Sequence, residues 1–304
     1  MNFGKKNLDE IETLRETYKK REISSDEKIQ IFRFGDKFYS TMHVLPRFET
    51  KILTHVISVY LQDKDTYLSP VFLVVEGNAG EGKTTQSIAS CIQHGITTIY
   101  VSASQLSGSH EHDSIDVMEN IYKKALELRK NGEKVALIID DFHLSNANID
   151  ENIKKTINSS LLTGYLMNLT QNKYDEKIPI ILTGNDFSKI YGPLIRAGRA
   201  EHFKWNPNYE EKKIIVSDIF KDFICCENIT FEHFFARCSN SSVAEFAQLR
   251  NEYRKLLIAN CLKGIQIFDD KAIQNISKII EKEKKMVTFE FLMTIAKERK
   301  MWRD

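Results

Sequence analysis

A glycine-rich octapeptide constrains this chain more than any other feature of its sequence. It reads Gly77-Asn78-Ala79-Gly80-Glu81-Gly82-Lys83-Thr84 and matches the pattern G-x-x-x-x-G-K-[S/T] at every required position. A short apolar run at residues 71–75 precedes it, and a helical pattern at 85–93 follows. Strand, loop and helix in this order predict a phosphate-binding loop, because glycines let backbone amides close around phosphate oxygens and a helix N-terminus favours anions.

Two side chains of this loop have distinct expected roles. Lys83 is expected to reach the β- and γ-phosphates of a nucleoside triphosphate, and the Thr84 hydroxyl is expected to ligate Mg²⁺. We also expect Lys83 to face solvent, so that its removal would cost little packing. ATP and Mg²⁺ are the expected ligands, held by Gly77, Asn78, Ala79, Gly80, Glu81, Gly82, Lys83, Thr84 and Thr85.

Short apolar runs alternate with helical patterns through the middle of the chain. The runs typical of buried strands lie at residues 71–75, 97–101, 135–139 and 178–182. Amphipathic helical patterns occur at 114–129 and 153–169, and only helical patterns remain after Pro207. The alternation predicts right-handed crossovers and a parallel sheet with helices on both faces. The predicted fold is therefore an α/β domain followed by a smaller all-helical domain.

The same patterns divide the chain into four predicted segments. These are a helical N-terminal extension at 1–65, an α/β nucleotide-binding domain at 66–206, a helical lid domain at 207–264 and a helical C-terminal extension at 265–304. The last segment is rich in lysine. A solvated amphipathic helix is the favoured interpretation of those lysines, and contact with nucleic acid is the alternative.

Composition and charge favour a soluble protein whose main partner is not nucleic acid. Of 304 residues, 42% are apolar and 28% are charged, and the formal net charge is +1. A strongly basic balance would have indicated nucleic acid. The polar start at residues 1–10 is unlike a signal or transit peptide, and no apolar run is long enough to span a bilayer. We therefore expect a cytoplasmic protein with no membrane partner.

Two carboxylates, Asp140 and Asp141, end the apolar run at 135–139. An acid at the end of a strand near a phosphate loop supports Mg²⁺ in nucleotide-hydrolysing proteins. We predict that Asp140 supports the metal and that Asp141 polarises the attacking water. An aspartate in the second role must lie close to the water or act through another water, because a base needs hydrogen-bond reach. The alternative is that both carboxylates only cap the strand.

Six further segments have distinctive amino-acid sequences. They read T-G-N-D-F-S at 183–188, Y-G-P-L-I-R-A-G-R at 191–199, E-H-F-K-W at 201–205, S-A-S-Q-L at 102–106, L-M-N at 166–168 and S-V-A-E-F-A-Q-L-R at 242–250. Together they resemble the corresponding stretches of Rubisco activase, a family of AAA+ ATPases. The resemblance covers about residues 70–260 and implies an AAA+ core, a P-loop parallel sheet flanked by helices, followed by a helical lid.

The resemblance also implies roles for four residues. Asn185 stands at the sensor-1 position, where an amide holds the attacking water near the γ-phosphate. Arg196 and Arg199 stand where the family places arginines that reach a neighbouring subunit's nucleotide, a role that suits a planar group that is always charged. Arg250 stands at a nucleotide-sensing position of the lid, although Glu252 replaces the second arginine of the family there. A surface ion pair is the alternative for Arg196 and Arg199, and an arginine on a helix surface is the alternative for Arg250.

The resemblance implies an ATP-hydrolysing ring, expected to be a hexamer, that remodels a protein client. The loop at 106–113 contains no aromatic residue to grip a threaded peptide. No tryptophan precedes Trp205, whereas the family carries one in its N-terminal extension for contact with Rubisco. The sequence therefore leaves the identity of the client undetermined. A nucleic-acid-associated AAA+ ATPase, such as a replication initiator, loader or transposition helper, is one alternative. A nucleotide-dependent scaffold with little turnover is another.

Overall fold

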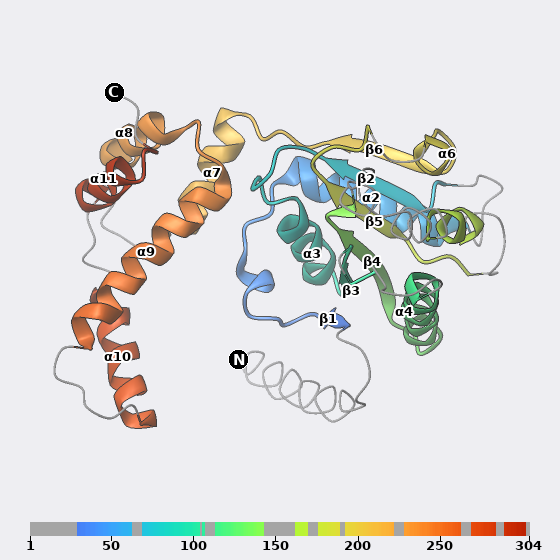
Figure 1. Cartoon of the computed structure of the whole chain (residues 1–304), viewed down its shortest axis with the longest axis horizontal. Coiled ribbons are helices and arrows are strands. Elements are labelled where there is room, and N and C mark those ends of the chain that lie inside the picture. The colour runs from blue at the N-terminus through green and yellow to red at the C-terminus, as the bar shows by residue number, and fades with distance from the viewer. Residues whose placement is uncertain are drawn as a thin grey trace, which may run out of the picture.

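The structure is a computed structural model, and it describes residues 29–62, 69–103, 105–106, 113–142, 162–169, 176–188, 192–221, 228–262, 269–283 and 289–301. Within these residues the chain forms an α/β body and a helical body (Figure 1). The loop predicted at 106–113 and the helix predicted at 153–169 lie largely outside the described residues. No helix in the described ranges combines the length and the apolar character needed to cross a bilayer.

A six-stranded sheet forms the centre of the α/β body. Its strands are β1 (Gln30–Phe32), β2 (Phe72–Glu76), β3 (Ile96–Ser102), β4 (Lys134–Asp140), β5 (Ile180–Gly184) and β6 (Ala200–Lys204). Their order across the sheet is β1-β3-β4-β5-β2-β6, and all neighbours are parallel except β1 and β3. The predicted fold class, a parallel α/β sheet followed by a helical domain, is confirmed. Strands β1 and β6 were not predicted.

Helices cover both faces of the sheet, which explains the unbroken apolar runs of the central strands. One face packs against α4 (Asp113–Lys130) and a helix at 162–169, in a core that includes Tyr122 and Leu166. The other face packs against α2 (Pro46–Leu61) and α3 (Lys83–Gln93). Residues on both sides of strand β4 are therefore buried, from Val135 to Ile139.

The predicted N-terminal extension contributes to the α/β body. Residues 30–32 form the edge strand β1, so the prediction of helix is wrong at that point. A second part of the extension, α2, is helical as expected, and it presses Phe48, Ile52 and Val56 into the core beneath the sheet. The apolar stripe of this helix was visible in the sequence, but the surface against which it packs was not.

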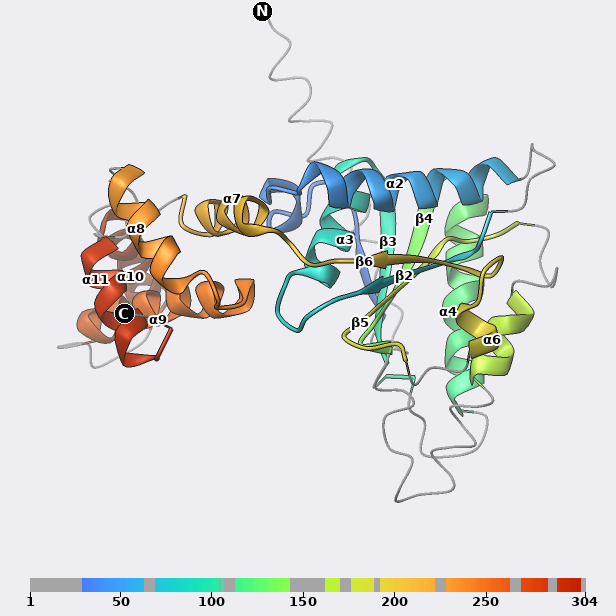
Figure 2. The same cartoon turned by 90° about the horizontal axis from the view of Figure 1, so that it is seen from above.

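The helical body has a core of its own. Its helices are α7 (Tyr209–Ile219), α8 (Asn228–Cys238), α9 (Val243–Cys261), α10 (Asp270–Glu283) and α11 (Phe289–Glu298). Capping boxes start α7 at Asn208 and α9 at Ser242. Phe289 and Leu292 of α11 lie in the same core as Phe246, so part of the predicted C-terminal extension packs with the lid helices. Helix α7, the first of these helices, lies on the side of this body that faces the sheet (Figure 2).

Candidate nucleotide site

The glycine-rich loop joins β2 to α3 and depends on its glycines for its shape. Gly82 has a φ of 77° where α3 begins, a backbone conformation that costs glycine nothing and other residues more. A Cβ on Gly77 would lie 2.0 Å from the carbonyl oxygen of Trp205, which no real side chain could tolerate. The loop is therefore held against the segment that follows β6.

Lys83 is buried, with 7% of its surface exposed. Its ammonium donates hydrogen bonds to the carbonyl oxygens of Gly77 and Asn78, each at 2.8 Å, and to Oδ1 of Asn185 at 2.9 Å. Burial lowers the pKa of Lys83, and the carboxylates of Asp141 and Asp140 oppose that shift. The expectation that Lys83 faces solvent is wrong, because the loop curls round the ammonium and supplies carbonyl acceptors to it.

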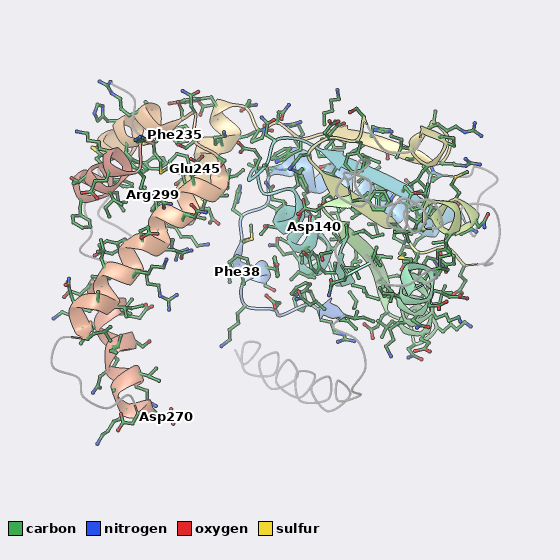
Figure 3. All side chains as sticks on the ribbon, in the orientation of Figure 1. Phe38, Asp140, Phe235, Glu245, Asp270 and Arg299 are labelled. Atoms are coloured by element: carbon green, nitrogen blue, oxygen red, sulfur yellow. The ribbon has the colours of Figure 1, made fainter. Side chains whose placement is uncertain are left out.

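Asp140 stands at the carboxyl end of β4, beside the start of α3 (Figure 3). Its Oδ1 accepts hydrogen bonds from the hydroxyls of Thr84 and Thr183, both at 2.5 Å, and from the backbone N–H of Asp141 at 3.0 Å. Its Oδ2 accepts a hydrogen bond from the Tyr100 hydroxyl at 3.0 Å. The structure thus brings together the two residues predicted to serve Mg²⁺, and it adds Thr183 and Tyr100.

Asp141 is exposed and ends β4 in a left-handed turn, with a φ of 53°. Aspartate tolerates this conformation better than most residues, although it is uncommon outside glycine. The turn points the backbone N–H of Asp141 at Asp140 and separates the surroundings of the two carboxylates. One carboxylate is held by several donors, and its neighbour stands at the solvent-exposed rim.

Asn185 follows β5, the strand next to β2. Gly184 lies opposite Glu76, and the N–H of Gly77 donates to the carbonyl of Gly184 at 3.3 Å. The Asn185 side chain therefore emerges directly beside the glycine-rich loop and reaches Lys83. Loop, lysine, amide and carboxylate all gather at the carboxyl edge of the sheet, where ligands bind in open α/β sheets.

The oxygen ligands at this edge suit Mg²⁺. The Thr84 hydroxyl and the Asp140 carboxylate lie in contact and present hard oxygen donors. Mg²⁺ prefers such donors and is commonly held by one or two carboxylates together with substrate phosphates. The residues present therefore fit the metal that the sequence predicts.

Trp205 supports the loop from below and was not predicted to do so. Its backbone N–H donates to Glu76 at 2.6 Å, and its indole N–H donates to the carbonyl of Glu81 at 2.8 Å. The ring is fully buried, packs edge-on against Phe48, and has the Arg47 guanidinium over it at 4.8 Å. One residue thus contacts the strand before the glycine-rich loop through its backbone and the loop itself through its side chain.

The comparison with known families agrees with this geometry. Residues 73–208 match the "ATPase family associated with various cellular activities (AAA)". Residues 73–208 therefore resemble an AAA domain, and the chain is similar to Rubisco activase. The resemblance predicted from the sequence is confirmed.

Several curated relatives are named ribulose bisphosphate carboxylase/oxygenase activase. That of Nostoc sp. is 33% identical over 193 residues, which cover 59% of this chain and 46% of the relative. The chloroplastic protein of Chlamydomonas reinhardtii is 28% identical over 214 residues, covering 66% of this chain and 51% of the relative. That of Spinacia oleracea is 30% identical over 198 residues, covering 61% and 42%. The chain therefore matches about half the length of these relatives.

The lid helices touch the loop of the AAA domain directly. Lys212 of α7 pairs with Glu81 at 2.9 Å and also donates to the carbonyl of Ser241 at 3.3 Å. The N–H of Ala244, at the start of α9, donates to the carbonyl of Gly80 at 2.9 Å. Arg250 lies further along α9, about 9 Å beyond Ala244 along the helix axis. A nucleotide-sensing role for Arg250 therefore stays a prediction.

The two arginines after β5 lie far from the loop of their own chain. Ala200 lies opposite Phe72, so Arg199 stands at the amino end of β2, whereas the loop leaves its carboxyl end. Strand β2 spans five residues, about 16 Å at 3.3 Å per residue, which exceeds the reach of an arginine side chain. Arg196 is exposed, and Arg199 is half-buried and donates to the carbonyl of Pro193 at 2.8 Å.

Proposed function

We propose that this chain is a Mg²⁺-dependent ATPase that assembles as a ring and remodels a protein client. The observation that carries the proposal is the contact set at the carboxyl edge of the sheet. Lys83 reaches Asn185, and Thr84 reaches Asp140, so the lysine of the phosphate loop, the amide and the metal-supporting pair converge on one place. The match to the AAA family supports the same conclusion.

Binding rests on the loop and its lysine. The backbone amides between Gly77 and Lys83 precede the N-terminus of α3 and would bind phosphate oxygens there. The Lys83 ammonium, held by two loop carbonyls and Asn185, adds a positive charge at that turn. Thr84 and Asp140 would hold Mg²⁺, which supplies positive charge to the phosphate oxygens when bound.

Hydrolysis needs a base and an orienting group near the terminal phosphate. Asp141 would accept a proton from water as the water oxygen forms a bond to the γ-phosphorus. The bond from the γ-phosphorus to the bridging oxygen breaks, and ADP leaves with that electron pair. The Asn185 amide, beside Lys83, would orient the water. Arg199, and with it Arg196, would stabilise the charge on the phosphoryl group of a neighbouring subunit.

The assembly and the client follow from the AAA resemblance. Several relatives are named as activases of ribulose bisphosphate carboxylase/oxygenase, and we propose a protein client of that general kind. The resemblance implies a ring, expected to be a hexamer. The distance of the arginines from the phosphate loop of their own chain supports an assembly of several copies. The sheet and its P-loop would supply the nucleotide-driven motion, and the lid helices would transmit it.

Replacing Lys83 tests the proposed nucleotide site. We expect Lys83→Ala to weaken the binding of a fluorescent ADP analogue about 100-fold, the equivalent of roughly 3 kcal/mol from charge-assisted hydrogen bonds. Lys213→Ala is the matched control, because Lys213 pairs with Glu232 on the exposed side of α7. Circular dichroism would check that both variants fold. Unchanged nucleotide affinity in Lys83→Ala would refute the phosphate-loop assignment.

A further inference from the structure

The carboxylate of Asp140 is held on both of its oxygens. Oδ1 faces the hydroxyls of Thr84 and Thr183, on the side of the phosphate loop. Oδ2 accepts a hydrogen bond from the Tyr100 hydroxyl, at 3.0 Å, on the opposite side. Tyr100 comes from β3, the strand next to β4 and away from the loop. Its hydroxyl therefore contacts Asp140 from the side opposite to the phosphate loop.

Aromatic side chains hold the ring of Tyr100 in turn. Phe32 of β1 meets the Tyr100 ring edge-on at a centroid distance of 6.3 Å, and Tyr39 meets Phe32 edge-on at 5.0 Å. Gln93 of α3 donates to the carbonyls of Tyr39 and Met42, at 2.7 and 2.9 Å. The segment from β1 to η1 (Tyr39–Thr41) is thus fastened to α3 and packs against the tyrosine.

The Tyr100 hydroxyl is the donor in its contact with Oδ2 of Asp140. A hydroxyl that donates to a carboxylate makes a charge-assisted hydrogen bond, which is stronger and shorter than a neutral one. Such a bond restricts rotation of the carboxylate about its Cβ–Cγ bond.

We propose that Tyr100 is a positioning residue that orients the Asp140 carboxylate so that Oδ1 faces Thr84 and the Mg²⁺ site. The proposal rests on the proposed function, because it takes Asp140 as the metal-supporting acid. Groups that hydrogen-bond to a metal-ligating carboxylate commonly alter metal affinity about 10- to 100-fold when they are removed. Tyr100 fits that role by its distance, by its strand and by the packing of its ring.

Two tyrosine-to-phenylalanine variants make a matched pair for the test. Tyr100→Phe removes the hydroxyl and keeps the ring against Phe32. Tyr60→Phe is the control. The Tyr60 hydroxyl donates to the carbonyl of Val135 at 2.8 Å and accepts from the N–H of Val135 at 2.6 Å, at the other end of β4 from Asp140. Each variant loses one hydroxyl that contacts β4 and keeps its aromatic ring.

The measurement is the affinity for a fluorescent ADP analogue over a range of free Mg²⁺ concentrations. We expect Tyr100→Phe to raise the Mg²⁺ concentration that gives half of the metal-dependent gain in affinity by about tenfold. Nucleotide affinity in excess EDTA should be unchanged in both variants. The same shift should appear in the Mg²⁺ dependence of ATP hydrolysis, while Tyr60→Phe should match the unaltered protein in both assays.

Asp140→Asn separates this proposal from the proposed function. If Asp140→Asn shifts the Mg²⁺ dependence and Tyr100→Phe behaves as Tyr60→Phe does, the positioning role of Tyr100 is overturned while the metal site stands. If neither Asp140→Asn nor Tyr100→Phe shifts it, the metal role of Asp140 fails, and the role of Tyr100 fails with it. A shift in both variants, absent from Tyr60→Phe, supports the proposal.

Discussion

Asp140 is half-buried and accepts hydrogen bonds on both carboxylate oxygens, whereas Asp141 beside it is exposed and ends the strand in a left-handed turn. Several donors around one carboxylate fix its orientation, which suits a metal ligand. An exposed carboxylate at the rim can approach a water molecule and take up a proton. Two identical side chains, adjacent in sequence, therefore have surroundings that fit different tasks.

We predict different failures when each of these carboxylates is replaced. Asp141→Asn should bind ATP and Mg²⁺ normally but lower the hydrolysis rate by about 10²- to 10⁴-fold, the usual effect of losing a general base. Asp140→Asn should instead weaken Mg²⁺-dependent binding. Steady-state hydrolysis and nucleotide binding over a Mg²⁺ titration would measure both effects. The opposite pattern would mean that the two residues have exchanged roles.

His55 makes the stability of the α/β body depend on pH. It lies on α2 with 2% of its surface exposed, and among the described residues its Nε2 meets no hydrogen-bond partner. Burial lowers the pKa of His55 to about 4, with Glu201 opposing the shift. The unfolded chain binds this proton near pH 6.5, so between pH 6.5 and 4 it takes up more protons than the folded chain.

We therefore predict that the free energy of unfolding falls as the pH drops through this window. The loss attributable to His55 should approach about 3 kcal/mol near pH 4 and vanish above pH 7. Urea unfolding of the unaltered protein and of His55→Leu at pH 7.0 and 4.5 would measure it. The variant should lose less stability than the unaltered protein over this interval, and equal losses would show that His55 does not titrate this way.

The site residues that could be predicted from the sequence belong to motifs whose members are adjacent in the chain. The glycine-rich loop and the pair Asp140-Asp141 are each contiguous, and each follows an apolar strand. Tyr100 meets Asp140 across 40 positions, and Trp205 meets Glu81 across 124. Tyrosine and tryptophan are common in any core, so only the strand order brings these contacts to light.

At the scale of elements, the phosphate loop and helix α7 are joined by an ion pair that is largely shielded from water. Glu81 occupies a variable position of the loop, and the side chains of Glu81 and Lys212 are only 7% and 14% exposed. Lys212 also donates to the carbonyl that precedes α9, at Ser241. The pair therefore connects the loop to two lid helices at one point.

We predict that breaking this pair destabilises the protein more than breaking an exposed one. Glu81→Gln should lower the free energy of unfolding by about 1.5–3 kcal/mol, because the Lys212 ammonium keeps its charge and loses its partner. The exposed pair Lys213–Glu232 is the control, where Glu232→Gln should change it by less than about 1 kcal/mol. Urea unfolding would measure both.

A double variant sharpens the comparison. Glu81→Gln combined with Lys212→Met should lose less stability than the sum of the two single variants, since no unpaired charge is left behind. Additive losses would mean that the two side chains do not stabilise each other.

The two strands that the sequence did not predict are the edge strands of the sheet. In β6 only Ala200 is buried, and the strand carries Glu201, His202 and Lys204, so no apolar run marks it. Strand β1 has three residues, Gln30–Phe32, in a segment rich in charge. Central strands are readable because both of their faces are buried, whereas an edge strand is defined mainly by its partner.

At the scale of the whole molecule, the sheet separates the two halves of the proposed catalytic apparatus. The loop, Asp140, Asp141 and Asn185 lie at the carboxyl edge, and Arg199 lies at the amino end of β2. Since one chain cannot close this distance, an arginine that serves hydrolysis must come from another copy. Hydrolysis per chain should then rise with protein concentration until assembly is complete.

We predict that two inactive variants restore activity to each other when mixed. Lys83→Ala fails at its own phosphate loop, whereas Arg199→Ala fails at its neighbour's, so mixed rings contain some interfaces where an intact loop meets an intact arginine. Arg199→Ala alone should lower hydrolysis about 10³-fold or more with little change in ATP affinity, because the arginine acts on charge that develops only during transfer. Arg254→Ala, on the exposed side of α9, should keep its activity.

Partial recovery in the mixture, measured by phosphate release, is the expected result. A mixture that stays inactive while light scattering shows that rings exchange subunits would mean that Arg199 takes no part in a neighbour's site, and full activity in a proven monomer would refute the ring mechanism.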